Sequence, residues 1–277
     1  MDVLGHTRFG GLQASLIGYT PPMSTPARPA ATVIILRDTE AGPEVLMLKR
    51  SGRAGFFPNA WVFPGGRVDE ADGATQTRGD ALGLHANDRA FGVAAIRETF
   101  EEAGVWLGDS PPSQSFRDAL NNREATLADA PDAVADLGRL AMWSWWITPE
   151  NEPKRYDTRF FVALLSVEES EAAACDEQET VEHRWLTPAA AVAEAEGGTF
   201  FVAPPTYLTL AELSNCASGM SVMQAALKRE VHPIMPKLDI SDGQWTVVLP
   251  GDPSYPAQHP VEGPTKVEFR EGRWWRC

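Results

Sequence analysis

The sequence predicts an α/β fold, in which strands and helices alternate along the chain. Apolar runs at 31–37 and 44–50, separated by a turn-like stretch, are typical of two paired strands. From Ala90 to about Ala103 apolar residues recur at helical spacing, which makes this stretch the clearest helix of the chain. Strand-like stretches resume at 142–148, so a sheet covered by at least one helix is expected.

Composition limits the class of protein. The chain has 277 residues, 43% of them hydrophobic, which suits one large domain with an ordinary core, or such a domain with an extension. Its net charge of −14 argues against a broad basic surface for nucleic acid or an anionic membrane. Neither a secretory signal nor a run of the ~18 apolar residues of a membrane span is apparent. Three widely spaced cysteines indicate neither a disulfide framework nor a zinc site, so a cytoplasmic protein is expected.

Loops separate the predicted elements of the N-terminal half. Residues 1–29 look irregular and end in a Pro-rich stretch, so the main domain is expected to begin at residue 30. The sequence AWVFPGG at 60–66 predicts a short strand that runs into a Gly-rich loop. Residues 73–89 are polar and loop-like, and the helix of 90–103 follows them.

The C-terminal half is expected to complete the main domain and then to extend it. Residues 113–138 predict one or two short helices. Three strand-like stretches and one helix follow, at 142–148, 159–165, 182–186 and 187–196. Beyond them the chain reads as two helical pieces, a Pro-rich tract and a hairpin around VEFREGRWW. We therefore predict a main domain at 30–203 and a mainly helical C-terminal extension at 204–277 that packs on it.

Three glutamates crowd the end of the predicted helix. Glu98, Glu101 and Glu102 are spaced i, i+3 and i+4, so their carboxylates share one helix face. Like charges so placed cost roughly 0.2–0.5 kcal/mol per pair. The last two glutamates lie just before Gly104, a likely helix terminator, and therefore face the negative end of the helix dipole. Three apolar residues point the opposite way: Val93, Ile96 and Phe100. A positive group is expected beside the glutamates.

A divalent cation would supply that positive charge. Carboxylates are the ligands that Mg²⁺ and Mn²⁺ prefer, and these ions bridge to phosphates. Upstream, the paired glycines Gly65 and Gly66 allow a phosphate to approach the backbone closely. Arg97 directly precedes the first glutamate. The alternative is a solvated acidic helix face, which is common in so acidic a chain.

These residues resemble the signature of the Nudix hydrolases, G-x5-E-x7-R-E-U-x-E-E-x-G-U, where U is apolar. The positions that fit are Gly66, Arg97, Glu98, Glu101, Glu102, Gly104 and Val105. Asp72 stands where the family has glutamate, and Thr99 occupies an apolar position. Residues 73–96 separate Asp72 from Arg97 where the signature has seven positions, which indicates an insertion at 73–89.

An insertion at this point resembles one branch of the family, the peroxisomal coenzyme A-hydrolysing type and its bacterial relatives. The likeness extends from about Thr32 to Leu186 and continues more weakly into the C-terminal extension. A coenzyme A signature, L-L-T-x-R-[SA]-x3-R-x3-G-x3-F-P-G-G, matches in part: Arg50 fits, whereas Leu48 replaces the threonine and Arg53 lies two positions from the second arginine. Coenzyme A is therefore a candidate substrate.

The resemblance implies a fold, a reaction and roles for the residues. The fold would be the Nudix α/β/α sandwich with a mixed sheet, and the reaction a metal-dependent hydrolysis of a diphosphate linkage. Glu101 and Glu102, with Glu98 as a further ligand, would hold Mg²⁺ or Mn²⁺. Glu98 would also position or deprotonate the attacking water, oriented by Arg97. The glycines at 65–66 would present backbone atoms to the phosphates.

Five further residues have two interpretations each. Arg50 and Arg53 would bind substrate phosphates, or they are ordinary exposed cations. Asp72 is either a weaker substitute for the family glutamate or a turn residue. Glu179 and Glu182 lie about where Nudix enzymes often supply another metal ligand or base, although in this acidic chain each is as well explained as a solvated side chain.

The expected partner is a small-molecule nucleoside diphosphate derivative, with coenzyme A or an acyl-coenzyme A as the first choice. ADP-ribose, a dinucleotide and a capped nucleotide are alternatives, and so is a nucleotide-sensing module that cleaves nothing. The intact glutamates favour an enzyme. No nucleic acid or membrane partner is expected. The sequence does not determine the oligomeric state, and a homodimer is one candidate because Nudix homodimers are common.

Overall fold

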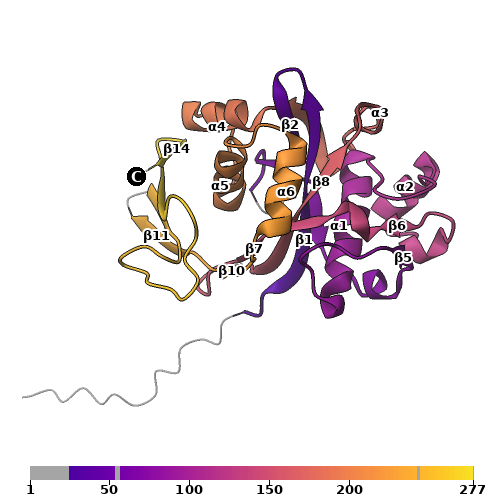
Figure 1. Cartoon of the computed structure of the whole chain (residues 1–277), viewed down its shortest axis with the longest axis horizontal. Coiled ribbons are helices and arrows are strands. Elements are labelled where there is room, and N and C mark those ends of the chain that lie inside the picture. Colours follow the sequence, from indigo (N-terminus) through magenta and orange to yellow (C-terminus); the bar gives the residue numbers. More distant parts are fainter. Residues whose placement is uncertain (1–24, 54–56, 242–243, 277) are drawn as a thin grey trace, which may run out of the picture.

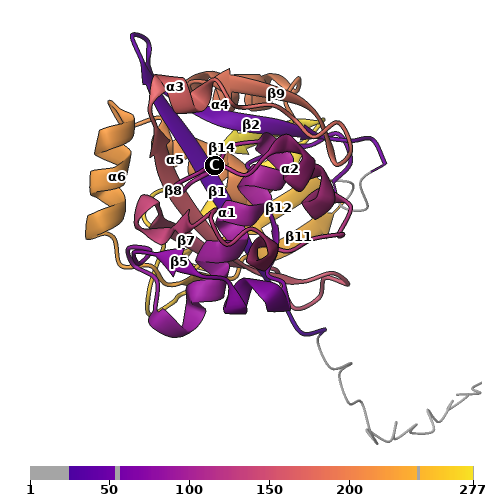
Figure 2. The same ribbon diagram turned by 90° about the vertical axis from the view of Figure 1, so that its right-hand side faces the viewer.

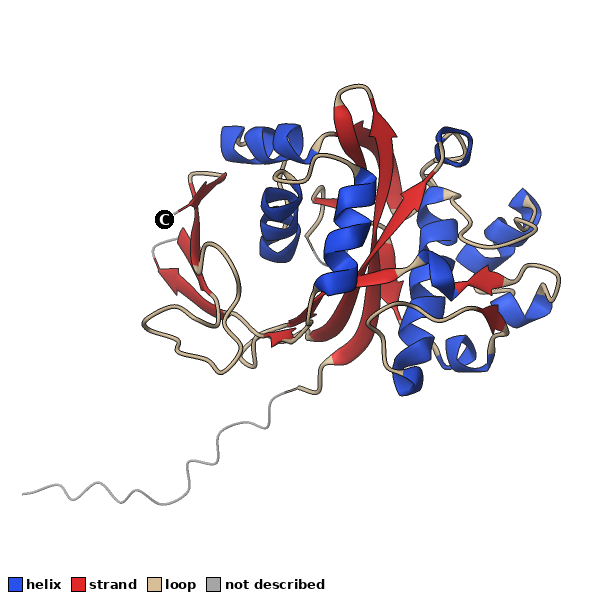
Figure 3. Ribbon diagram, in the orientation of Figure 1, coloured by secondary structure: helices blue, strands red, loops and turns tan. Residues whose placement is uncertain are grey.

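The computed structural model describes residues 25–53, 57–241 and 244–276. Most of the predicted irregular segment 1–29 therefore lies outside the described residues. Within them, an eight-stranded mixed sheet carries helices on both faces (Figures 1 and 3). Its centre is β1 (Arg28–Thr39), which runs antiparallel to β2 (Gly42–Arg50) and parallel to β8 (Tyr156–Leu165). The predicted α/β fold with a mixed sheet is confirmed.

The other strands of this sheet are short or lie at its margins. On one side β7 (Ala141–Ile147) pairs with β8, and β10 (Pro233–Ile234) pairs with β7. On the other, β3 (Trp61–Val62) and β9 (Thr180–Leu186) both pair with β2. The paired glycines, which we predicted to form a loop, lie instead in β4 (Gly65–Arg67), because β1 offers this short segment a backbone partner.

Alternation along β1 divides the core into two layers. Val33 and Ile35 face the first layer, whereas Ile34 and Leu36 face the second, as the period-2 geometry of a strand requires. The first layer is covered by α1 (Arg89–Ala103) and α2 (Gln114–Asn121). Three helices cover the second: α4 (Pro188–Gly197), α5 (Pro204–Leu213) and α6 (Gly219–Lys228). Figure 2 shows α1 and α6 on opposite sides of β1 and β8, and the one-turn α3 (Val167–Ser170) follows β8.

The helix α1 forms where the apolar spacing predicted it. Val93, Ile96 and Phe100 are all buried against the sheet. Gly104 ends the helix in the left-handed conformation (φ +70°), and its N–H donates to the carbonyl of Phe100. Glu102 is also buried, so the acidic face of this helix is turned toward the protein and not toward bulk water.

The insertion at 73–89 is more ordered than the predicted loop. It begins within a 3₁₀ helix (Glu70–Ala74), continues through β5 (Thr77–Arg78) and ends in a 3₁₀ turn (Ala86–Asp88). β5 pairs in parallel with β6 (Ala135–Asp136). Along the chain, β6 lies between two further 3₁₀ turns, at 127–129 and 137–139. Arg78 forms ion pairs with the carboxylates of Asp109 and Asp136, which fasten the insertion to the body of the protein.

The C-terminal extension is not mainly helical as predicted. After α5 and α6, β10 joins the main sheet and four strands form a second, antiparallel sheet, seen at the left of Figure 1. These strands are β11 (Lys237–Ser241), β12 (Gln244–Val248), β13 (Lys266–Arg270) and β14 (Arg273–Arg276). One face of this sheet packs on α4 and α5. There the Trp274 ring stacks on Tyr207 at 5.3 Å between centroids, and its Nε1–H donates to the Val202 carbonyl at 2.9 Å.

Among the described residues, no helix has the length and apolar character needed to cross a membrane.

Candidate active site

A cavity of about 860 Å³ lies between the main sheet, the end of α1 and the C-terminal sheet. This volume falls within the ~300–1,000 Å³ of small-molecule sites. Nine of the eleven predicted site residues line it: Arg50, Gly65, Gly66, Asp72, Arg97, Glu98, Glu101, Glu102 and Glu179. The strand β4 brings the glycines to the cavity and the last two turns of α1 bring the glutamates. Residues that are distant in the sequence therefore line one concave surface.

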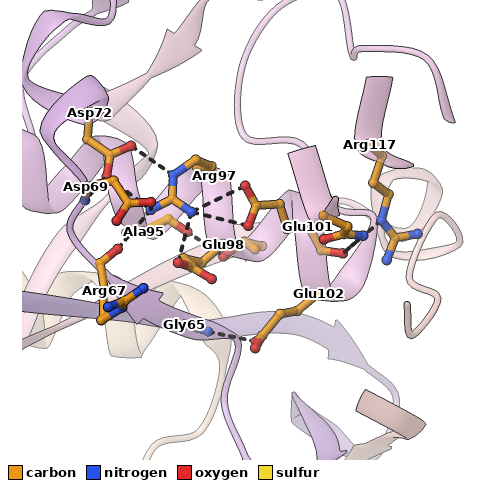
Figure 4. A network of polar contacts seen from close by, with 12 residues as sticks. Gly65, Arg67, Asp69, Asp72, Ala95, Arg97, Glu98, Glu101, Glu102 and Arg117 are labelled. Atoms are coloured by element: carbon orange, nitrogen blue, oxygen red, sulfur yellow. Dashed lines mark hydrogen bonds and ion pairs between the residues drawn. The ribbon is translucent and has the colours of Figure 1, made fainter. Parts of the chain in front are cut away.

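Arg97 is the positive group beside the glutamates (Figure 4). Its side chain is buried, and its guanidinium is bonded on every side. Nη1 donates to Glu98 at 2.9 Å and to Glu101 at 3.2 Å. Nε and Nη2 donate to the two carboxylate oxygens of Asp72 at 2.9 and 3.0 Å, and Nη2 also donates to the Arg67 carbonyl at 2.8 Å. The predicted contact between Arg97 and Glu98 is therefore present.

Asp72 holds Arg97 in place. It is 2% exposed, and besides its two bonds to Arg97 its carboxylate accepts the backbone N–H of Asp69 at 2.7 Å. A planar two-point pair with a guanidinium fixes both direction and distance. The two interpretations of Asp72 stay predictions. Its side chain is committed to positioning Arg97, and it lies in the 3₁₀ helix that opens the insertion.

The glycines are required by close approaches at the cavity wall. A side chain at Gly66 would place its Cβ 2.4 Å from the carboxyl carbon of Glu98, and one at Gly65 would lie 2.4 Å from the Ala31 carbonyl oxygen. The backbone N–H of Gly65 donates to Glu102 at 3.0 Å. The absence of side chains lets β4 touch both glutamates.

The site carries more negative charge than its surroundings stabilise. Burial raises the pKa of Glu98 to about 7, although Arg97 opposes the shift. Burial also raises the pKa of Glu101, again against Arg97. The pKa of Glu102 lies well above its usual range because of burial and the nearby Glu98 charge, with the Gly65 N–H opposing. Further positive charge beside these carboxylates would lower their pKa values.

The residues fit a hard divalent cation by donor type. As they lie, no three acidic, histidine or cysteine side chains of the described residues converge on one point, because Arg97 draws Glu98 and Glu101 while Gly65 draws Glu102. All three glutamates nevertheless offer oxygen donors to one cavity, and all three have pKa values that a cation would restore.

Of the remaining predicted residues, some line the cavity and others do not. Arg50, at the end of β2, lines the cavity, and its buried Nε has no hydrogen-bond partner among the described residues. Glu179 lines the cavity as well. Among the described lining residues neither Arg53 nor Glu182 occurs: Arg53 is exposed, and Glu182 pairs with Lys49 on the surface at 3.3 Å.

Part of the cavity wall comes from the C-terminal sheet, which sequence reasoning missed. Its lining residues are Leu238, Ile240, Trp245 and Val247. The only signal in the sequence is alternation, LDI at 238–240 and WTV at 245–247, over stretches too short to distinguish from loop.

Comparison with known proteins identifies relatives across most of the chain. The family model described as the NUDT19 Nudix domain matches residues 74–213. The chain is 31% identical to the putative nudix hydrolase 7 of Caenorhabditis elegans, covering 86% of this chain and 78% of that protein. It is 27% identical to the human acyl-coenzyme A diphosphatase NUDT19, covering 77% and 72%. A crystal structure of a NUDIX hydrolase from Alicyclobacillus acidocaldarius aligns with a TM-score of 0.64 at 26% identity, over 72% of this chain and 96% of that one, and confirms the sandwich fold.

Proposed function

The chain belongs to the Nudix hydrolase family, and on that basis we propose that it hydrolyses the diphosphate linkage of coenzyme A or an acyl-coenzyme A. The products would be 3′,5′-ADP and 4′-phosphopantetheine or its acyl derivative. The observation that carries this proposal is the row of three glutamates along a cavity of ligand size, with Glu102 buried and Glu98 and Glu101 partly buried. The coenzyme A assignment is supported by relatives named acyl-coenzyme A diphosphatase in chicken, frog and human.

We assign Glu101 and Glu102 to the metal, with Glu98 within reach of the same cation. Mg²⁺ or Mn²⁺ suits these oxygen donors, and when bound it would neutralise phosphate charge and make a water more acidic. Two further residues fix the direction of the Glu98 side chain. Arg97 keeps the Glu98 carboxylate pointed into the cavity, and Asp72 keeps Arg97 fixed.

In the proposed step a water oxygen bonds to one phosphorus of the diphosphate as the bridging P–O bond breaks. Glu98 takes the proton of the water, and the electron pair of the broken bond leaves with the second phosphate. A base whose pKa lies near neutral pH is suited to this transfer. Glu179, which also lines the cavity, is the alternative base.

Phosphate binding is assigned to the part of the cavity wall beside the glutamates. Arg50 has an unsatisfied donor there, and Gly65 and Gly66 let the phosphates approach β4. The positions of Arg53 and Glu182 outside the described cavity lining do not support roles for them. Residues 30–203 would form the catalytic unit, with 204–277 packed on it. A cytoplasmic location and a homodimer stay predictions from the sequence.

A substrate screen tests the proposal. Coenzyme A, an acyl-coenzyme A, ADP-ribose, NADH and diadenosine tetraphosphate would each be incubated with Mg²⁺ or Mn²⁺ and the products identified by mass. We expect the coenzyme A compounds to give the highest kcat/KM. A preference for ADP-ribose or a dinucleotide by ~100-fold, about 2.7 kcal/mol in transition-state binding, would contradict it. Binding of nucleotides without turnover would indicate a sensor.

A further inference from the structure

The loop that precedes β9, residues 171–179, brings a further carboxylate to the cavity. Asp176 and Glu179 of this loop line the cavity that holds the glutamate row. Burial is the main cause of the raised pKa values of Glu98 and Glu102, and the charge of Glu179 adds to both shifts. A carboxylate from a distant segment of the chain therefore acts on the same site as the glutamates of α1.

Asp176 shapes the turn that carries Glu179. Its carboxylate accepts the backbone N–H groups of Gln178, Glu179 and Thr180 at 3.3, 3.1 and 2.8 Å. The hydroxyl of Thr180, a fully buried residue, donates to the same carboxylate at 2.7 Å. Within the turn Glu177 adopts a left-handed backbone conformation (φ +59°), which is uncommon outside glycine and persists where surrounding contacts impose it. One carboxylate thus sets the direction in which Glu179 leaves the backbone.

Arg117 of α2 joins this loop to the end of α1. Its Nε donates to the Glu101 carbonyl at 3.0 Å, and its Nη2 donates to the Ala174 carbonyl at 2.8 Å. The N–H of Ala174 donates in turn to the Ala103 carbonyl at 2.9 Å. Figure 4 shows Arg117 beside Glu101 at this end of the helix. The two segments that bring carboxylates to the cavity are therefore fastened to each other by one side chain.

Capping of a helix does not by itself account for Arg117. The side chain is 5% exposed, and no carboxylate of the described residues forms an ion pair with it. Buried charges without a paired partner are rare because they cost free energy. A neutral amide would suffice for the cap, since Asn121 already donates to the Glu101 carbonyl at 3.3 Å. Burial lowers the pKa of Arg117, and the charge of Asp176 is the largest influence against that shift, so the cation also attracts the loop.

These contacts set the position of Glu179 relative to α1. With Glu98 as the base, the Glu179 carboxylate is available to the cation. Building on the proposed function, we propose that Asp176 and Arg117 are positioning residues of the metal centre that act through Glu179. Asp176 directs this carboxylate into the cavity, and Arg117 holds its loop against α1, so that Glu179 reaches the same Mg²⁺ or Mn²⁺ ion as the glutamates of the helix.

Binding of Mn²⁺ to the substrate-free protein tests the proposal without reference to any substrate, with the unbound ion measured by its EPR signal. Asp176→Asn keeps the size of the side chain but replaces one acceptor oxygen by an NH₂ donor, so the turn is no longer held from both oxygens. Asp252→Asn is the matched control. Asp252 holds a turn in the same way, through the N–H and hydroxyl of Ser254 at 2.8 and 2.6 Å, and is absent from the described cavity lining.

The expected pattern is a loss that passes through Glu179. Asp176→Asn should raise the Kd for Mn²⁺ about tenfold and Glu179→Gln by as much or more, whereas Asp252→Asn should change it less than about twofold. The double variant of Asp176→Asn and Glu179→Gln should bind Mn²⁺ no more weakly than Glu179→Gln alone, because a positioning residue has no effect once the group it positions is lost.

Arg117→Lys tests the second positioning residue. Lysine keeps the charge but lacks the planar fork that bonds two carbonyls at once. Arg155→Lys is its control, because Arg155 is 8% exposed, donates to the backbone carbonyls of Thr148 and Thr25, and is absent from the described cavity lining. We expect Arg117→Lys to raise the Kd for Mn²⁺ about fivefold more than Arg155→Lys does.

Several outcomes would overturn the proposal. These are an unchanged Mn²⁺ affinity in Glu179→Gln, equal effects of either substitution and its control, and additive losses in the double variant, which would mean that Asp176 supports the fold and not Glu179. A wild type that binds no Mn²⁺ would overturn it together with the metal assignment. A wild type that binds Mn²⁺ in the expected pattern but cleaves no coenzyme A compound would contradict the proposed function alone.

Discussion

At the scale of the residue, the charge balance at the end of α1 decides the chemistry. The glutamates crowd one helix face, and the guanidinium of Arg97 offsets only part of their charge. Glu98 is the residue on which this balance has the clearest effect, because burial raises its pKa to about 7, well above that of an exposed glutamate.

The pH dependence of stability follows from this shift. A carboxyl whose pKa is higher in the folded than in the unfolded state lowers the free energy of unfolding as pH rises between those two values. The metal-free protein should therefore lose up to about 3 kcal/mol between pH 4.5 and 8 through Glu98, and Glu98→Gln should abolish that part of the loss. Urea unfolding at several pH values, with EDTA, measures it. Wild-type and variant curves of equal slope against pH would contradict the assignment.

The same substitution should lower kcat by roughly 10²–10⁴ with KM little changed if Glu98 is the base. A defect that added Mg²⁺ rescues would show that Glu98 is a metal ligand and that Glu179, the nearer alternative, carries the proton.

The sequence predicted the contact of Arg97 with Glu98 but not the whole pattern of partners. Spacing along one helix specifies which side chains share a face, so the glutamate row could be foreseen. The partner that fixes Arg97, Asp72, lies across an insertion, and its commitment to the guanidinium depends on the path of that insertion in space.

At the scale of the element, glycine at residue 66 lets β4 lie close to the Glu98 carboxylate of α1. Gly66→Ala would bring a methyl group 2.4 Å from the Glu98 carboxyl carbon. Since that carboxyl is the end of a flexible side chain, we expect it to move away, with less than about 1 kcal/mol lost in stability but at least a tenfold loss in kcat. Kinetics and thermal unfolding of Gly66→Ala would measure both.

Gly73→Ala is the control for this prediction. Gly73 lies beside Asp72, yet a Cβ there would meet no atom within 4 Å, so both activity and stability should be kept. Equal activity losses in the two variants would mean that the backbone, and not the approach to Glu98, requires glycine at residue 66.

The elements differed in how far the sequence could specify them. The helix α1 repeats its apolar period over four turns, and β1 and β2 are long strands with apolar centres, so local pattern was enough. The C-terminal strands have four or five residues each, and the Pro-rich segment 249–265 separates β12 from β13. Their pairing is a tertiary event that no local window contains.

At the scale of the whole molecule, the C-terminal sheet is held to the Nudix body through one face. Trp274→Ala should remove the stacking on Tyr207 and the bond to Val202, and cost about 3–5 kcal/mol, the usual range for a buried tryptophan. Trp275, the next residue of β14, points to the other face and is 39% exposed. Trp275→Ala should change stability by less than about 1 kcal/mol, and chemical unfolding of the two variants makes the comparison. Equal losses would show that the sheet is not docked through Trp274.

The parallel pairing of β1 with β8 sets an order of assembly during synthesis. Arg28 lies opposite Tyr156, so the central pair of the main sheet cannot close until most of the intervening chain, including the insertion and α1, has left the ribosome. Such distant pairing is slow to form, because a long loop must close before any contact stabilises it. β11 and β12 emerge later still. A nascent chain would thus have its glutamates in place before the C-terminal part of the cavity wall exists, and the enclosed cavity would be the last feature of the protein to appear.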